Sequence, residues 1–187
     1  MRLRSKKSGF TLMEMMTAAV ISTMILFAAI TMFISGASAW LKGSEAIETE
    51  TQSKQAIRVM SNELREAMMV TIDGNKLGLT YRLPKRQSDG TFVAPAVWDG
   101  VTRRIYLSSG KIYLQDNGGS RVICRNVILT DPKNAGASYV LFTAGAGSTL
   151  RDVTVKVITQ RIIPRGPTLY SRKREVVFLR NVPSIVS

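Results

Sequence analysis

Residues 15–41 contain no charged side chain, and this run constrains the chain more than any other feature of its 187 residues. Its stretch MMTAAVISTMILFAAITMFI is by itself long enough to cross a hydrocarbon core about 30 Å thick as a helix. Glu14 stands at its start as the sole charge between Lys7 and Lys42. The run therefore predicts a membrane-spanning helix that carries one acid near its entrance.

Two interpretations of this segment leave something unexplained. A secretory signal peptide would end at the small residues 37–39, but its apolar region is usually only about 7 to 15 residues long. A plain single-pass anchor explains the length and leaves Glu14 without a role. A carboxylate deep in a membrane costs roughly 2.5 to 3.5 kcal/mol on insertion scales and is usually paired. The alternative for Glu14 is a side chain that reaches up to the lipid headgroups.

The stretch KKSGFTLMEMMTAAV resembles the processing site of type IV pilins and of the pseudopilins of type II secretion. This resemblance covers residues 1 to about 41. It implies a leader, residues 1–9, that a prepilin peptidase removes between Gly9 and Phe10, followed by N-methylation of the Phe10 amine. It also implies that Glu14 pairs with the terminal amine of a neighbouring subunit. The implied partners are the peptidase, other pilin or pseudopilin subunits and an inner-membrane assembly platform.

Two departures from the main filament subunits favour a minor subunit. The first proline of the chain is Pro84, whereas major pilins commonly have one within the N-terminal helix, and Cys124 is the sole cysteine, which rules out a two-cysteine loop. The stretch QAIRVMSNELREAM resembles the corresponding helix of J-type minor pseudopilins and W-type minor pilins. The four basic residues of the leader predict a cytoplasmic N-terminus and a periplasmic or extracellular C-terminal part, anchored in a bacterial inner membrane.

Beyond the spanning segment, residues 10–41, the helical period continues to about residue 70 with an amphipathic pattern. Gly36 and Gly43 are the points where we expect a bend or an interruption. From Asp73 onward the chain alternates short runs rich in β-branched and aromatic residues with turn residues. Residues 42–187 are therefore predicted to form one α+β unit, an antiparallel β-sheet packed on the second half of the helix. The expected strands are KLGLTYRL, TFVAPAVW, RRIYL, KIYLQ, RVICRNVIL, SYVLFTA, DVTVKVITQRII and REVVFLRNV, with a hairpin in RIYLSSGKIYL.

The sequence contains few of the residues and motifs that are typical of catalytic or metal-binding sites. The chain has no histidine, which removes the commonest general base and the commonest metal ligand. The sequence TAGAGS is followed by a predicted strand, so it lacks the helix that a phosphate-binding loop requires. Cys124 lies in an apolar run and is expected to act as a small buried hydrophobe. We therefore expect no enzyme activity, cofactor or metal.

The chain has 26 lysines and arginines against 13 acids, and part of this excess gathers near the last hairpin. The basic residues concerned are Arg161, Arg165, Arg172, Lys173, Arg174 and Arg180. Such a patch suits DNA phosphates, as in minor pilins that take up DNA, and equally suits a solvated strand face or acidic neighbours in a filament. The alternatives to a filament subunit are thus a membrane-tethered DNA-binding minor pilin and a plain anchored periplasmic protein.

Overall fold

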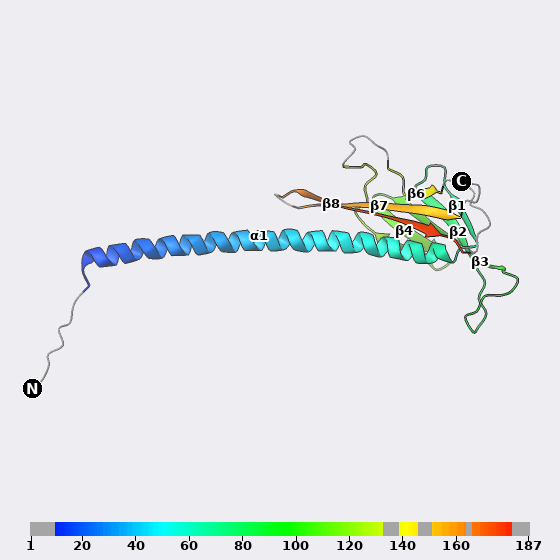
Figure 1. Ribbon diagram of the computed structural model, residues 1–187, viewed down its shortest axis with the longest axis horizontal. Helices are drawn as coiled ribbons and strands as arrows, with labels where there is room; N and C mark the ends of the chain where they lie inside the picture. Colours follow the sequence, from blue (N-terminus) through cyan, green and yellow to red (C-terminus); the bar gives the residue numbers. More distant parts are fainter. Residues whose placement is uncertain (1–9, 133–138, 146–150, 164–165, 181–187) are drawn as a thin grey trace, which may run out of the picture. The chain divides into compact units, whose positions relative to one another are not determined.

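One long helix opens the computed structural model, which describes residues 10–132, 139–145, 151–163 and 166–180 (Figure 1). This helix, α1, runs from Leu12 to Arg65 without a break, so the interruption expected at Gly36 or Gly43 is not found. A glycine inside a helix costs only about 1 kcal/mol, and no proline precedes Pro84 to remove a hydrogen bond. α1 includes a stretch long and apolar enough to cross a membrane.

The chain divides into two compact units, Met1–Ser44 and Glu45–Ser187. In the first unit, every described residue from Phe10 to Ser44 is exposed. In the second, α1 buries one stripe of side chains at spacings of three and four residues, as the sequence predicted for an amphipathic helix. The buried residues of α1 are Thr49, Ser53, Ala56, Ile57, Met60, Ser61 and Leu64.

α1 ends at Arg65, a few residues before the predicted end near residue 70. The Ala67 amide still donates to the Leu64 carbonyl at 3.1 Å, but the Met68 amide already donates to the Arg82 carbonyl at 2.9 Å. Residues 69–72 then pair with a neighbouring strand. Pairing in the sheet has therefore replaced the last helical turn that the local pattern favours.

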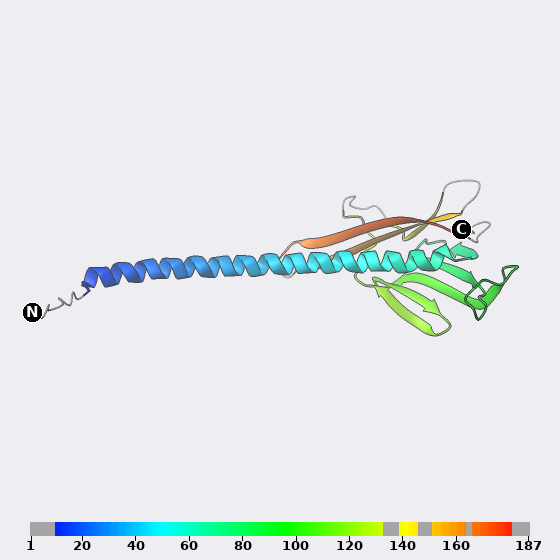
Figure 2. The same cartoon turned by 60° about the horizontal axis from the view of Figure 1, so that its bottom comes forward.

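The strands form two antiparallel sheets where the sequence predicted one (Figures 1 and 2). The five-stranded sheet follows chain order and consists of β1 (Met69–Ile72), β2 (Gly78–Pro84), β3 (Trp98–Ser108), β4 (Lys111–Asp116) and β5 (Gly119–Cys124). The three-stranded sheet consists of β6 (Phe142–Ala144), β7 (Asp152–Ile162) and β8 (Thr168–Phe178), with β7 in the centre. The two sheets meet where the Lys76 carbonyl accepts hydrogen bonds from the Leu141 and Phe142 amides, at 3.1 and 3.0 Å.

The predicted hairpin in RIYLSSGKIYL is confirmed as β3 and β4, which pair with Ser108 opposite Lys111. Its two turn residues, Ser109 and Gly110, have φ angles of 48° and 70°. Two successive positive φ angles make the tight turn whose twist matches that of the flanking strands.

Several predicted strands differ from the observed ones, and three of the differences are described here. The stretch 91–98 is a loop up to Trp98, because Pro95 has no amide to donate to a ladder. The strand expected over 121–129 ends at Cys124, and Val127 forms an isolated bridge to Thr159. The last strand begins at Thr168, earlier than expected, because β8 pairs with β7 along its whole length.

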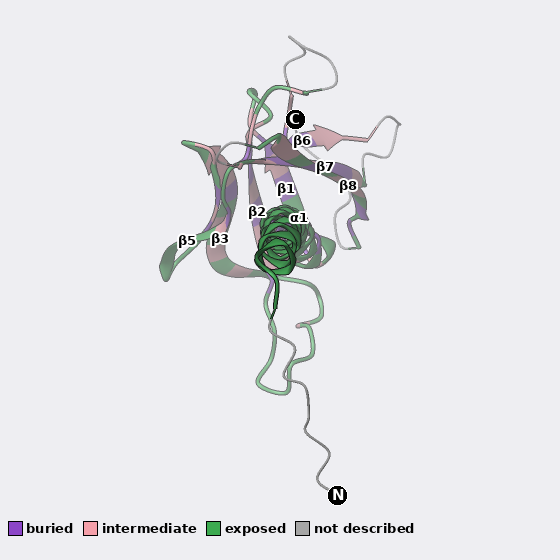
Figure 3. Ribbon diagram, turned by 90° about the vertical axis from the view of Figure 1, so that its left-hand side faces the viewer, coloured by how far each residue is buried: buried purple, intermediate pink, exposed green. Residues whose placement is uncertain are grey.

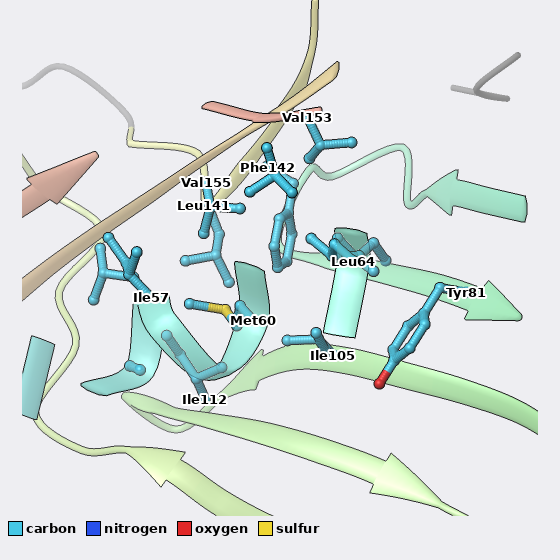
Figure 4. Packing of buried hydrophobic residues seen from close by; sticks show 14 of the residues in the cluster. Ile57, Met60, Leu64, Tyr81, Ile105, Ile112, Leu141, Phe142, Val153 and Val155 are labelled. Atoms are coloured by element: carbon cyan, nitrogen blue, oxygen red, sulfur yellow. The ribbon is translucent and has the colours of Figure 1, made fainter. Parts of the chain in front are cut away.

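A single hydrophobic core joins the end of α1 to both sheets (Figure 3). In Figure 4, Met60 of α1 lies between Phe142 of β6 and Ile112 of β4, and all three are fully buried. Polar groups also cross from the helix to the smaller sheet, since the buried hydroxyls of Ser53 and Ser171 are 2.7 Å apart. The α+β fold, a long helix packed on antiparallel sheets, agrees with the fold class predicted from the sequence.

Candidate functional site at the start of the long helix

The start of α1 is closed by two residues of the predicted processing region, Thr11 and Glu14. Oε2 of Glu14 accepts hydrogen bonds from the Thr11 amide at 2.8 Å and from the Thr11 hydroxyl at 3.0 Å. The Glu14 amide donates in return to the Thr11 hydroxyl at 3.3 Å. This reciprocal pair is a capping box, in which the residue before the helix and the third helical residue satisfy each other's free amides.

The capping box gives Glu14 an intrachain partner that the sequence interpretation missed. The signal was present as Thr-x-x-Glu directly before an apolar run, and that pattern can be recognised from local spacing alone. Phe10 lies just before the box with 83% of its surface exposed. Gly9, the other predicted cleavage residue, lies outside the described residues.

The helix surface over residues 15–41 is almost entirely apolar, and several of its hydroxyl groups are turned back onto the backbone. Four of them donate to carbonyl oxygens three or four residues earlier, at 2.8 to 2.9 Å. Internal hydrogen bonding of this kind suits a lipid or helix-packed environment, where no water is present to satisfy a hydroxyl. These residues are Thr17, Thr23, Thr31 and Ser38.

Comparison with known proteins identifies this same segment. Residues 4–30 match the family model described as the prokaryotic N-terminal methylation motif. The match supports a type IV pilin-like family, and the exposed apolar helix that follows fits a membrane anchor. No curated protein and no solved structure matches the chain.

The predicted basic patch is distributed over different surfaces rather than gathered on one. Neighbouring strand residues face opposite sides, so Lys173 points to α1, where it donates to Glu50 at 2.9 Å, while Arg172 pairs with Asp131 elsewhere. Nε of Arg161 lies 2.6 Å from a carboxylate oxygen of Glu45 on α1. Of the remaining members of the patch, Arg174 and Arg180 are exposed and Arg165 lies outside the described residues. DNA binding by this set stays a prediction.

Cys124 is a buried free thiol, and burial raises its pKa from 9.0 to about 11. The folded chain should therefore react very slowly with a thiol reagent near pH 8, because the attacking thiolate is scarce and covered. After denaturant is added, we expect one thiol per chain to react rapidly, which a colorimetric thiol assay measures. Since the unfolded thiol ionises first, stability should fall as the pH rises from about 9 to 11. Fast labelling of the folded protein near neutral pH would contradict this prediction.

Proposed function

We propose that this chain is a minor pilin or pseudopilin subunit that assembles through its N-terminal helix into a type IV pilus or a type II secretion pseudopilus. The observation that carries the proposal is the match of residues 4–30 to a methylation motif, continued by an exposed apolar helix that leads into a folded α+β unit. The type it most resembles is the J-type minor pseudopilin or the W-type minor pilin. Its role is structural, without catalysis.

Processing is the first step of the proposed mechanism. A prepilin peptidase cuts after Gly9, and the amine of Phe10 is then methylated. Before assembly the apolar helix anchors the subunit in the inner membrane in a single pass, with the basic leader on the cytoplasmic side and the folded unit outside. The high exposure of Phe10 supports access for both modifications.

Assembly is the second step, and it uses the carboxylate of Glu14. The capping box occupies Oε2 of Glu14 with two hydrogen bonds from the same chain. A carboxylate has about four lone-pair sites, so it can accept a further bond from the terminal amine of a neighbouring subunit without releasing Thr11. Pairing the two charges allows both to enter an apolar filament core.

The cleavage site is tested by determining the N-terminus and intact mass of the chain purified from membranes. We expect a chain that begins at Phe10 and is one methyl group heavier than its sequence. Gly9→Leu should abolish the cut, because the peptidase must approach the backbone closely at that position. Ser5→Leu makes the same kind of change within the leader and should leave cleavage intact. A chain that begins at Trp40 would establish a secretory signal peptide instead, and an uncut chain would establish a plain anchor.

A further inference from the structure

The face of the smaller sheet that points away from α1 carries three cations close together. Lys173 and Glu175 of β8 pair with residues of α1, so the alternating residues Arg172 and Arg174 lie on the opposite face. Lys156 of β7 stands directly opposite Arg174 in the strand register. Directly opposed side chains share one face, with Cβ atoms about 4.5 to 5.5 Å apart, and like charges there destabilise the strand pair. The fold therefore holds Lys156 and Arg174 together against their mutual repulsion.

All three cations line a pocket of about 320 Å³, together with Tyr139 and Val140 of the segment that precedes β6. Hydrogen bonds fix this segment at both ends. The Tyr139 amide donates to the Leu129 carbonyl at 2.8 Å, and the Lys156 amide donates to the Leu141 carbonyl at 2.9 Å. Pockets for small molecules usually measure about 300 to 1,000 Å³. The volume therefore suits a small ligand rather than an extended chain.

Two of the three cations have no acidic partner within the described ranges. Arg172 pairs with Asp131, which lines the same pocket. Lys173 also contributes to the lining, but its ammonium group donates to a glutamate of α1 on the other face. Neither Lys156 nor Arg174 forms an ion pair with any residue that the structure describes. The pocket is thus left with two uncompensated positive charges on neighbouring strands.

We propose that this pocket binds inorganic phosphate or the phosphate group of a small monoester, between Lys156 and Arg174. A phosphate monoester carries a charge of about −1.5 to −2 at pH 7 and has three acceptor oxygens, so one such group balances both cations. The arginine can bind two of these oxygens through parallel N–H groups, and the lysine acts as a point charge. A carboxylate, or one phosphate of a nucleic-acid backbone, carries a single charge and leaves one cation uncompensated. The proposal stands independently of the proposed filament role.

The test is isothermal titration calorimetry of the full chain in a neutral detergent with inorganic phosphate and with phenyl phosphate. Dimethyl phosphate, a diester with a single charge, is the ligand control. We expect saturable binding of the first two ligands that weakens as salt is added, and binding of dimethyl phosphate that is weaker by about tenfold or more. The double variant Lys156→Gln, Arg174→Gln should weaken phosphate binding by about tenfold or more, because it removes both unpaired cations. Tighter binding of phenyl phosphate would identify a monoester as the ligand, and tighter binding of inorganic phosphate would identify the ion itself.

A matched variant separates the pocket from the general charge of the protein. Lys111→Gln with Arg125→Gln also removes one lysine and one arginine, from exposed positions outside the pocket, and should change affinity by less than about twofold. Equal weakening by the two double variants would overturn the proposal, and so would the absence of saturable phosphate binding by the unmodified chain. Tighter binding of a single-stranded oligonucleotide without a terminal phosphate, lost in the pocket variant, would also overturn it and favour nucleic acid.

Thermal unfolding provides a second measurement. Phosphate should raise the unfolding temperature of the unmodified chain and of the Lys111→Gln, Arg125→Gln variant, because a ligand that binds only the folded state stabilises it. It should leave the Lys156→Gln, Arg174→Gln variant unchanged. Without phosphate, this pocket variant should unfold at the same temperature as the unmodified chain or higher, since two opposed like charges are gone. A clearly lower temperature would mean that the two cations stabilise the fold itself, and would overturn the proposal.

Discussion

Glu14→Gln should give a chain that is still cut after Gly9 but no longer co-purifies with its filament partners after membrane extraction. The proposed function requires the Glu14 carboxylate to neutralise a neighbour's terminal amine inside an apolar filament core. Leaving one charge of a buried pair without its partner typically costs about 3 to 5 kcal/mol. A loss of that size lowers an association constant by more than a hundredfold, so assembly should fail while maturation, checked by intact mass, continues.

The capping box makes the glutamine variant more informative than alanine. Glutamine also serves as the third helical residue of a capping box, so Glu14→Gln can keep the hydrogen bonds from Thr11 and lose only the charge. Glu14→Ala loses both the hydrogen bonds from Thr11 and the negative charge. Thr11→Ala is the complementary control, because it removes the cap at a cost of about 0.5 to 2 kcal/mol and retains the carboxylate.

These three variants distinguish the roles of Glu14. If the charge decides assembly, Glu14→Gln and Glu14→Ala fail alike and Thr11→Ala largely assembles. If the cap decides it, Thr11→Ala fails and Glu14→Gln assembles. Normal assembly of a fully matured Glu14→Ala would mean that the side chain only reaches the headgroups, and the proposed pairing would then be wrong.

Phe142→Ala should lower the free energy of unfolding of the second unit by about 3 to 5 kcal/mol. The ring is fully buried where β6 meets the end of α1, so its removal leaves a cavity that both sheets and the helix surround (Figure 4). The cavity should destabilise α1 and both sheets together, because the three layers share one set of buried contacts. Urea denaturation of the full chain in detergent, followed by near-ultraviolet circular dichroism, measures the change.

Phe178→Ala is the matched control, since it makes the same chemical change in the same small sheet at a side chain that is 70% exposed. Its effect should stay within about 0.5 kcal/mol. Similar losses for the two variants would show that the Phe142 contacts do not carry the stability assigned to them. Two separate unfolding transitions in Phe142→Ala would show that the sheets fold independently.

Features that depend only on neighbouring residues could be predicted from the sequence. The uncharged run after Glu14 predicts a spanning helix because length and composition alone decide whether a segment suits lipid. The methylation motif is likewise a short contiguous pattern, and so is the Thr-x-x-Glu spacing of the capping box. The change from helical to strand periodicity near residue 70 predicted the fold class for the same reason.

Features that join distant parts of the chain depend on the folded structure and could not be predicted from local patterns. The strands separate into two sheets because α1 fills the space between them, and strand periodicity does not state which strands share a sheet. Residues 69–72 form a strand instead of continuing the helix, because they pair with residues 79–82 of β2. The sequence predicted that the basic residues near the last hairpin form one patch. Side chains alternate along β8, however, so Lys173 faces the helix and Arg172 faces away from it.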